Sequence, residues 1–213
     1  MTVMSGDSVI AVRSEFSIEE PWRTPADALP VRLRRSTDGA APRLATTVAA
    51  YYDDEFLTFV FSGSDDHIEA TYFSHDEPLY EEDVVEVFLA PSDPAEYFEI
   101  EVNPNGAMFD AHIVSPEGSR ETMRADRSWQ SGAVAAVRKN VEADGTMTID
   151  TLLRVPFEAF GNGARRGGRW RCNLFRIDRH PTQGDEYSAW RPTLRDPADF
   201  HVPASFGVLE FRR

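Results

Sequence analysis

Apolar residues recur along the chain in short alternating or compact runs that are rich in Val, Ile, Phe and Tyr. Runs of this kind predict β-strands. We expect strands at residues 9–16, 44–51, 56–62, 67–73, 83–89, 96–103, 107–114, 134–142, 146–155, 169–178 and 206–212. A sustained helical period of about 3.6 residues is absent, so helix content should be very low. We expect a single helical turn at residues 156–161, ended by Gly161.

Turn-forming pairs separate the predicted strands. Asp38-Gly39, Asn105-Gly106 and Asp144-Gly145 are typical of hairpin connections, because Gly, Asn and Asp tolerate positive φ. A parallel sheet would need intervening helices, which the pattern lacks. The sequence therefore predicts an all-β protein, a two-sheet antiparallel β-sandwich of the jelly-roll or immunoglobulin-like kind. The glycine-rich, basic residues 161–168 should form a hairpin loop, and the long stretch 179–205 should be either functional or a packed Ω-type loop.

Length and composition fit one globular domain spanning residues 1–213. The chain is 41% hydrophobic and contains 14 Phe, 6 Tyr and 4 Trp, which is enough apolar surface for a full core. Cys172 is the only cysteine, so an intramolecular disulfide cannot form. Its apolar neighbours predict a small buried side chain rather than a nucleophile.

The formal net charge of −14 argues against nucleic acid and anionic membranes as partners, because both attract clustered Lys and Arg. Neutral sugars and cations remain compatible with it. A basic start followed by a long apolar run is absent, and so is an apolar segment of about 18 residues. We expect a soluble protein, either cytoplasmic or exported with a signal that this chain lacks; its oligomeric state is left open.

One segment stands out for its chemistry. Residues 76–89 run from an acidic, aromatic loop into an apolar strand in which Glu86 lies between Val84 and Phe88. An unpaired carboxylate among apolar neighbours is costly, so its presence indicates a role. That role is either contact with a polar ligand or an ion pair with Arg176 or Arg171.

The next strand adds further polar groups. Alternation places Tyr97, Glu99, Glu101 and Asn103 on one face of residues 96–103. Past the Asn105-Gly106 turn, Asp110 and His112 share a face of the following strand, and we expect them to extend this polar surface. The alternative is a solvated outer face, which antiparallel sheets often have.

Several weak motifs occur in a recognisable order: residues 76–89, 97–106, 170–176 and 187–190, followed by 206–211. In this order the chain resembles carbohydrate-binding module family 9 over roughly residues 8–212. The resemblance implies non-catalytic binding of a mono- or oligosaccharide. The family clamps a terminal sugar between two tryptophans; Trp190 matches one of them and Tyr80 replaces the other. Glu86 and Asn103 match family residues that bind sugar hydroxyls, whereas Glu101 stands where a well-known branch has an arginine.

The predicted ligand-binding residues are therefore Tyr80, Glu86, Glu101, Asn103 and Trp190. Aromatic faces pack against the C–H patches of a pyranose ring, while carboxylates and amides pair with its hydroxyls. We assign no catalytic residue. The alternatives are a glycoside hydrolase or hydrolase-associated domain that uses Glu86 and Glu101 as acid and base, or a protein-interaction sandwich with a vestigial pocket.

The other tryptophans, Trp22, Trp129 and Trp170, are expected to pack in the core or at its edge. A structural calcium ion is an option, because related modules bind one and the turn residues Asp53, Asp54, Asp65, Asp66 and Asp93 supply hard oxygen ligands. A calcium-loop pattern and a helical zinc spacing are both lacking, so we assign no metal ligands.

Overall fold

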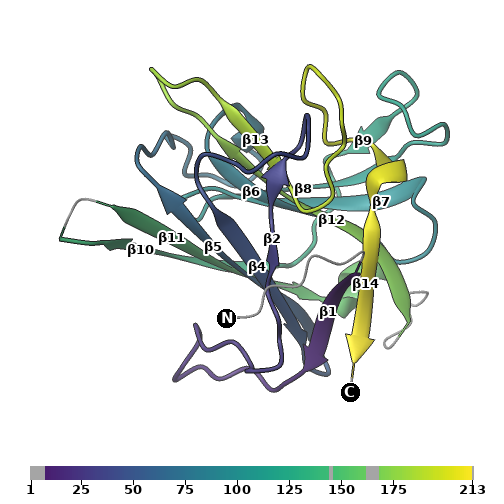
Figure 1. Ribbon diagram of the computed structural model, residues 1–213. Coiled ribbons are helices and arrows are strands. Elements are labelled where there is room, and N and C mark those ends of the chain that lie inside the picture. The colour runs from purple at the N-terminus through teal and green to yellow at the C-terminus, as the bar shows by residue number, and fades with distance from the viewer. Residues whose placement is uncertain (1–7, 144–145, 162–167, 213) are drawn as a thin grey trace.

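A computed structural model describes residues 8–143, 146–161 and 168–212, and within them the protein consists of strands and three short 3₁₀ helices (Figure 1). The strands are β1 (Ser8–Arg13), β2 (Val31–Arg32), β3 (Arg34–Arg35), β4 (Thr46–Tyr52), β5 (Phe56–Asp65), β6 (Val84–Ala90), β7 (Glu96–Val102), β8 (Met108–Val114), β9 (Arg124–Asp126), β10 (Val134–Val141), β11 (Met147–Pro156), β12 (Arg169–Asp178), β13 (Glu186–Ala189) and β14 (Gly207–Arg212). The 3₁₀ helices are η1 (Leu79–Glu81), η2 (Phe157–Phe160) and η3 (Pro203–Ser205).

The nearly all-β class is confirmed. Every predicted strand except 67–73 overlaps an observed one. The predicted helical turn is also present as η2, and it ends at Gly161 with φ of 69°. The sequence pattern missed β2, β3, β9 and β13, because strands of two to four residues are too short to establish a period.

The strands form one continuous hydrogen-bonded path in the order β10-β11-β5-β4-β1-β14-β12-β6-β7-β8-β9. The strands β10, β11, β5 and β4 make one arm of this path, and β12, β6, β7 and β8 make the other (Figure 1). The two arms meet at β1, which runs parallel to both β14 and β4. The sheet is therefore mixed and continuous, whereas we had expected antiparallel pairing within two separate sheets.

The main core lies between the two arms. Phe59 and Leu153 from one arm, and Val87, Ile100 and Leu174 from the other, belong to one cluster of buried side chains. Trp170 is 1% exposed in this cluster, as the sequence predicted for it, and Cys172 is fully buried there. The burial of both inner faces explains why apolar residues dominate these strands.

A second buried cluster covers the opposite, outer face of the β12-β6-β7-β8 arm. Phe88, Phe109 and Phe175 come from the strands, and Leu79 and Phe200 come from the loops that cover them. Two long segments, 66–83 and 190–206, supply this cover. The outer face of this arm is thus buried, and the alternative of a solvated face is wrong.

Residues 67–73 form an irregular loop where a strand was expected. Side chains satisfy its backbone groups: Asp83 accepts a hydrogen bond from the amide of Glu69 at 2.8 Å, and Asn105 donates to the carbonyl oxygen of Ala70 at 2.9 Å. Because carboxylate and amide groups replace strand pairing here, apolar content alone gave the wrong element.

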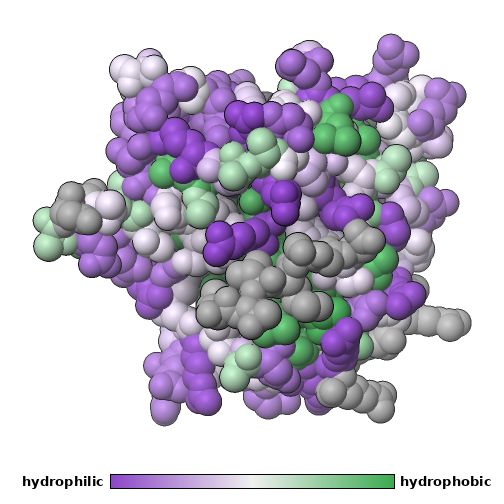
Figure 2. Space-filling model, in the orientation of Figure 1, coloured by the Kyte–Doolittle hydropathy of each residue, from purple (hydrophilic) through white to green (hydrophobic). Residues whose placement is uncertain are grey.

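The Asn105-Gly106 turn joins β7 and β8 as predicted, with φ of 81° at Gly106. The predicted Asp144-Gly145 turn and most of the 161–168 loop lie outside the described residues. Hydrophilic side chains cover most of the face shown in Figure 2, and apolar ones occur there in small patches.

Candidate functional site

Buried carboxylates lie on the outer face of the β12-β6-β7-β8 arm. Side chains alternate along each strand, so Glu86 of β6 lies on the same face as Phe88, and Glu99 and Glu101 of β7 lie on the same face as Tyr97. Glu86 is directly opposite Glu101 in the antiparallel register. The strand pairing therefore gathers three carboxylates among aromatic rings.

We call Glu86, Glu99 and Glu101 the acidic triad. Their side chains are nearly inaccessible, with exposed fractions of 2%, 6% and 0% for the three residues. One oxygen from each carboxylate lies within 4.8 Å of the others. Glu101 shares a hydrogen bond with Glu99 that favours its protonated form and so raises its pKa, and its carboxyl oxygens have no other hydrogen-bond partner among the described residues.

Burial controls the protonation of the acidic triad. It raises the pKa of Glu99 to about 7, although Arg120 and Arg127 act in the opposite direction. The pKa values of Glu86 and Glu101 are raised well above the usual range, first by burial and then by repulsion from the neighbouring carboxylates. Without a bound cation or donor, the triad therefore holds protons near neutral pH.

His201 and Tyr97 extend this polar group. The Tyr97 hydroxyl lies 2.7 Å from His201 Nδ1, and His201 Nε2 lies 3.9 Å from a carboxylate oxygen of Glu99. Burial lowers the pKa of His201 to about 4. The imidazole is therefore neutral at physiological pH and adds no positive charge beside Glu99.

A pocket of about 330 Å³ opens above Glu86 and Glu99. We call it the outer-face pocket. Its wall includes the aromatic side chains of Tyr80, Tyr187 and Phe200, of which the last two come from the long 179–205 stretch. The pocket thus has a carboxylate floor and an aromatic wall.

Three arginines, Arg120, Arg127 and Arg179, complete the lining. Arg179 connects two parts of the wall, because it donates hydrogen bonds to the carbonyl oxygen of Tyr80 at 2.9 Å and to the Tyr187 hydroxyl at 2.6 Å. Arg127 lies 3.4 Å from the Tyr80 hydroxyl. These contacts fix the position of Tyr80 at the pocket.

Comparison with known proteins identifies the family. The model of carbohydrate-binding family 9 matches residues 35–211, which is most of the chain. The protein belongs to carbohydrate-binding family 9. The match includes the acidic triad and the whole aromatic wall of the outer-face pocket.

The relatives of this family 9 domain are distant. A protein from Arthroderma benhamiae, described as an extracellular protein, is 25% identical over 181 residues and 78% of each chain. A crystal structure from Bacteroides uniformis has a TM-score of 0.70 at 16% identity and covers 96% of this chain and 99% of its own. A family 9 module from Caldicellulosiruptor kristjanssonii, solved with cellotriose, has a TM-score of 0.60 at 10% identity and covers 96% and 93%. The same module solved with glucose also gives 0.60. At these identities the structures establish the fold alone.

The structure brings three of the five predicted ligand-binding residues of this family 9 domain to one place. Tyr80 and Glu86 both line the outer-face pocket. Glu101 lies beside Glu86 in the acidic triad but is fully buried beneath the pocket. Glu101 is therefore not placed to touch a ligand in the pocket directly, and it would influence one only through Glu86 and Glu99.

Trp190 lies elsewhere. It is 5% exposed and belongs to the main core between the arms, not to the lining of the outer-face pocket. Its ring packs so tightly against Gly207 that a Cβ atom there would lie 2.1 Å from Trp190 Cη2. The expected pairing of Tyr80 with Trp190 is therefore not formed.

The side chain of Asn103 hydrogen-bonds to backbone groups. Its amide nitrogen donates to the carbonyl oxygen of Tyr72 at 2.9 Å, and its side-chain oxygen accepts from the amides of Asn105 and Ala107 at 3.0 and 2.9 Å. Asn103 thus ties the β7–β8 turn to the 66–83 loop. Its polar groups point to a structural role in this arrangement.

Sequence reasoning missed much of the pocket wall. Tyr187 lies in β13, a strand too short to show a period, and Phe200, His201 and the three arginines lie outside the strands. The one available signal was the length of the 179–205 stretch with its aromatic residues, which left function and a packed Ω-type loop as alternatives. Glu99 was noticed on the sequence but could not be separated from a solvated residue.

Asp110 and His112 do not extend the polar surface, contrary to expectation. In the antiparallel register Glu99 is opposite Ala111 and Glu101 is opposite Phe109, so Asp110 and His112 face the other side of β8. The error arose because the sequence does not show the register across the turn. In the observed register, odd-numbered residues of β7 pair with odd-numbered residues of β8, so residues 110 and 112 face the side opposite to Glu99 and Glu101.

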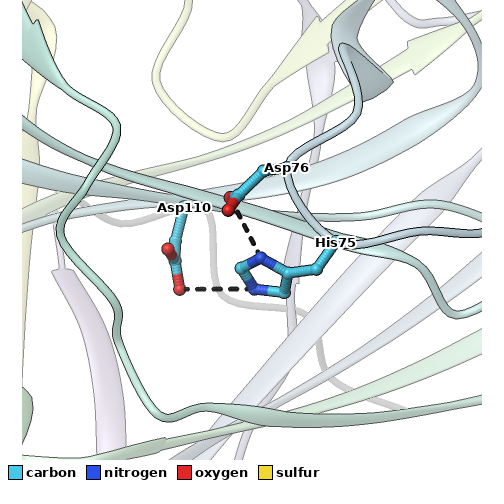
Figure 3. Close-up of side chains that lie close together, drawn as sticks. All are labelled: His75, Asp76 and Asp110. Atoms are coloured by element: carbon cyan, nitrogen blue, oxygen red, sulfur yellow. Dashed lines mark ion pairs between the residues drawn. The ribbon is translucent and has the colours of Figure 1, made fainter.

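Asp110 instead joins a second cluster with His75 and Asp76 (Figure 3). The His75 ring lies 3.0 Å from Asp76 and 3.8 Å from Asp110. Asp110 also accepts hydrogen bonds from the backbone amide and the hydroxyl of Ser131, at 2.9 and 2.5 Å. His75 and Asp76 are exposed, unlike the members of the acidic triad.

The predicted ion pair between Glu86 and an arginine of β12 is wrong. Arg176 faces the other side of its strand and bonds Asp65 at 2.9 Å and Asp178 at 2.5 Å. Arg171 donates to the carbonyl oxygen of Phe206. Glu86 is instead opposite Phe175 of β12.

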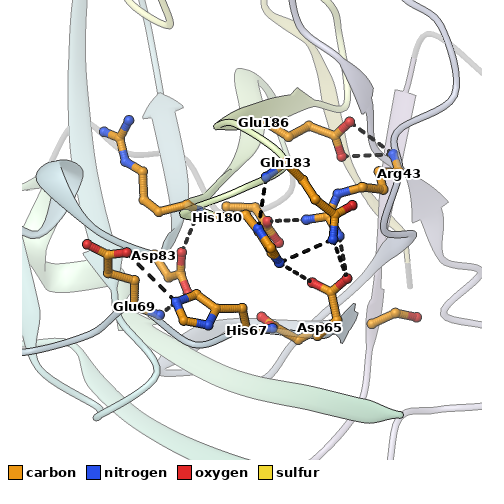
Figure 4. A network of polar contacts seen from close by, with 12 residues as sticks. Arg43, Asp65, His67, Glu69, Asp83, His180, Gln183 and Glu186 are labelled. Carbon is orange, nitrogen blue, oxygen red and sulfur yellow. Dashed lines mark hydrogen bonds and ion pairs between the residues drawn. The ribbon is translucent and has the colours of Figure 1, made fainter.

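The charges around Arg176 belong to a wider polar network (Figure 4). Arg43 bonds Asp178 at 2.8 Å, and its backbone amide donates to both oxygens of Glu186 at 2.9 Å. Asp83 accepts a hydrogen bond from the amide of Arg179 at 2.7 Å, and burial raises the pKa of Asp83 to about 7. The network holds the segment that carries Arg179 and Tyr187 into the pocket wall.

The turn aspartates considered for calcium have protein partners instead. Asp53 pairs with Arg154, Asp65 with Arg176 and Asp66 with Arg43, and Asp93 accepts from the amide of Ala95. The side-chain groups with metal-ligating geometry in the described chain are the acidic triad and the His75 cluster. Over the same described residues, none of the helices has the length and apolar character needed to cross a bilayer.

Proposed function

We propose that this family 9 domain binds a mono- or oligosaccharide in the outer-face pocket without catalysing its hydrolysis. The single observation that carries the proposal is an aromatic wall above carboxylates, in a pocket of about 330 Å³, within a chain that matches carbohydrate-binding family 9. The family members from Caldicellulosiruptor kristjanssonii with cellotriose and with glucose support a glucose-type sugar as the first ligand to test.

The pocket has the chemistry that a sugar needs. Tyr80 offers an aromatic edge for ring C–H groups, and Tyr187 and Phe200 offer others on the far wall. Glu86, at the floor, can accept or donate hydrogen bonds to hydroxyls according to its protonation. The guanidinium groups of Arg120 and Arg127 add donors at the opening.

We revise the predicted ligand set accordingly. Tyr80 and Glu86 contact the sugar, and Glu101 sets the charge of the floor. Asn103 and Trp190 hold the turn and the core, and Tyr187 or Phe200 takes the stacking place that the family gives to its second tryptophan. The chain acts as one domain, with its two arms serving as the layers of a sandwich, and its charge of −14 disfavours nucleic acid and anionic membranes as partners.

Isothermal titration of the full chain with glucose, cellobiose, cellotriose and a panel of other soluble glycans tests the proposal. We expect saturable binding to at least one of these sugars. Tyr80→Ala and Glu86→Gln should each weaken it about tenfold or more, because each removes a contact at the pocket. Trp22→Ala is the matched control, since Trp22 lies at a different surface, beside Arg138.

Absence of binding by the wild type across the panel, or equal binding by the wild type and Tyr80→Ala, would refute the proposal. Release of reducing ends from the same glycans is measured in parallel. Turnover that is abolished by Glu86→Gln with the fold intact would establish the hydrolase alternative in its place.

A further inference from the structure

The outer-face pocket is richer in positive charge than the protein as a whole. The chain has 36 acidic and 22 basic residues and a formal net charge of −14. Three of its arginines, Arg120, Arg127 and Arg179, nevertheless line this one pocket. Charges of one sign gathered in a cleft attract ligands of the opposite sign and raise their local concentration. The arginines therefore bear on the charge of the ligand as well as on its hydrogen bonds.

Two of these three arginines already have a carboxylate partner. Arg120 donates a hydrogen bond to Asp199 at 2.8 Å. Arg179 pairs with Asp185 and also donates to the wall residues described above. A carboxylate of the protein thus balances the charge of each of these two guanidinium groups.

Arg127 differs from the other two. In the part of the chain that the structure describes, it forms no ion pair with a carboxylate; its contacts are the Tyr80 hydroxyl at 3.4 Å and the face of the Phe109 ring, whose centre lies 5.5 Å away. The adjacent Asp126 accepts hydrogen bonds from Ser128 instead. The two aromatic residues hold the guanidinium at the pocket. Arg127 therefore offers a positioned positive charge, with several N–H donors, to a ligand.

The floor of the pocket does not supply the missing negative charge. Burial raises the pKa of Glu99 to about 7 and that of Glu86 well above its usual range, so both carboxyl groups hold protons in mildly acidic buffer. Arg127 opposes this rise for Glu99 but forms no ion pair with it. A protonated carboxyl group donates a hydrogen bond and does not repel an anion. Near pH 6 the described lining thus combines a neutral floor with the unbalanced charge of Arg127.

We propose that the sugar bound in the outer-face pocket is a uronic acid, whose carboxylate pairs with Arg127. This inference rests on the proposed function, because it names the class of sugar for the same pocket. A planar carboxylate fits the guanidinium fork and accepts two parallel hydrogen bonds. One guanidinium balances the single charge of a uronate, whereas a phosphate ester carries nearly two. Glucuronic acid is glucose with a carboxylate in place of its CH₂OH group, so it keeps the ring C–H faces that an aromatic wall contacts.

Isothermal titration of the full chain at pH 6 with matched sugars tests the assignment. The pairs are glucuronate with glucose and galacturonate with galactose. An ordinary carboxyl group has a pKa of about 4, so both uronates are ionised at this pH. We expect at least one uronate to bind about tenfold or more tightly than its neutral counterpart. Added NaCl should weaken the binding of the uronate and not that of the neutral sugar, and the uncharged methyl ester of the uronic acid should lose the advantage.

Arg127→Gln should abolish the preference for the uronate, because the glutamine amide can still donate to a hydroxyl but carries no charge. Arg124→Gln is the matched control. It lies three residues earlier, is also exposed, makes the same change in net charge and is not part of the pocket lining, so it should keep the preference. Thermal unfolding of both variants checks that they fold.

The outcomes separate this inference from the proposed function. Binding of the neutral sugars with equal or weaker binding of their uronates would overturn the inference and leave the proposed function in place. An unchanged preference in Arg127→Gln, or the same loss in Arg124→Gln, would also overturn it. Absence of binding by every sugar, neutral or acidic, would refute the proposed function and the inference with it.

Discussion

Glu86 and Glu101 occupy directly opposed positions on the neighbouring antiparallel strands β6 and β7, and both side chains are buried. Like charges at such positions are normally destabilising. Two ionised carboxylates at these positions would lower the free energy of unfolding unless protons or a cation neutralise their charge. Titratable groups that are destabilised in this way cluster at functional sites. The same face of the sheet also forms the floor of the outer-face pocket.

Stability should depend on the protonation of Glu99. Its pKa rises from an ordinary 4.5 to about 7 in the folded protein, so the fold favours the protonated form. This contribution to the free energy of unfolding is complete below about pH 4.5 and is lost as the pH rises through about 7. In metal-free buffer the wild type should lose roughly 2 kcal/mol relative to Glu99→Gln between pH 5 and pH 8.

Urea unfolding at the two pH values, with EDTA present, measures this difference. His201 responds with the opposite sign, because its lowered pKa of about 4 gives stability above pH 6.5 that is lost as the pH falls through 4. It is present in both proteins, as are Tyr97 and Arg120, so the comparison with Glu99→Gln reports the Glu99 carboxyl together with its effect on the pKa values of Glu86 and Glu101, which its charge raises. An identical pH dependence of the two proteins would contradict the prediction.

Trp190→Ala should act on stability. Because the indole fills the main core against Gly207, its removal leaves a cavity and should lower the free energy of unfolding by roughly 3–5 kcal/mol. Trp22→Ala, which removes a half-buried ring beside Arg138, should cost less than about 1 kcal/mol. Chemical denaturation compares the two. A small loss for Trp190→Ala with a selective loss of sugar affinity would instead restore it as a ligand residue.

Arg176 should be necessary for folding stability through its two buried partners. Arg176→Met leaves Asp65 and Asp178 without this guanidinium and should cost about 3–5 kcal/mol. Adding Asp65→Asn and Asp178→Asn to the same chain should recover much of the loss, since the stranded charges are then removed. Thermal unfolding of the single and triple variants tests this, and an equal loss in both would argue that packing of the side chain matters more than charge.

Arg179→Ala should weaken sugar binding, because Arg179 positions Tyr80 and Tyr187 in the pocket wall. The change frees the carbonyl of Tyr80 and the hydroxyl of Tyr187, which Arg179 now links across the pocket wall. We expect about a tenfold loss of affinity with the fold retained, and partial recovery in Arg179→Lys, which can restore one hydrogen bond. Calorimetry with the sugar found for the wild type provides the measurement. Unchanged affinity in Arg179→Ala would show that the wall holds its shape without this link.

The sequence predicted most long strands, because nearly all of them bury at least one face and so keep a readable apolar pattern; β10, which has only half-buried and exposed residues, was found from its run of apolar residues at 134–137. The alternation in residues 96–103 also placed Glu99 and Glu101 on one face correctly. What failed was pairing: the parallel contacts of β1 with β14 and β4 depend on segments far apart in sequence, and no local pattern encodes them. The 67–73 error has a different cause, since side-chain acceptors replaced strand pairing there.

The candidate site was predictable only where strands supply it. Glu86 could be found because a carboxylate among strand apolar residues is unusual, whereas Phe200 and His201 reach the pocket from a loop whose path depends on the network around Asp83 and Arg43. Trp190 was misplaced for a related reason. An aromatic residue in a long segment looks the same on the sequence whether it turns toward a ligand or toward the core.

The parallel pairing of β1 with β14 also determines how the domain would respond to mechanical force. Tension applied at Ser8 and Arg212 pulls the two strands in opposite directions along their length, because they run the same way and are held at opposite ends. All of the evenly spaced hydrogen bonds between them then carry the load together rather than breaking one after another. The first and last strands thus form a shear clamp that resists extension of the whole sheet.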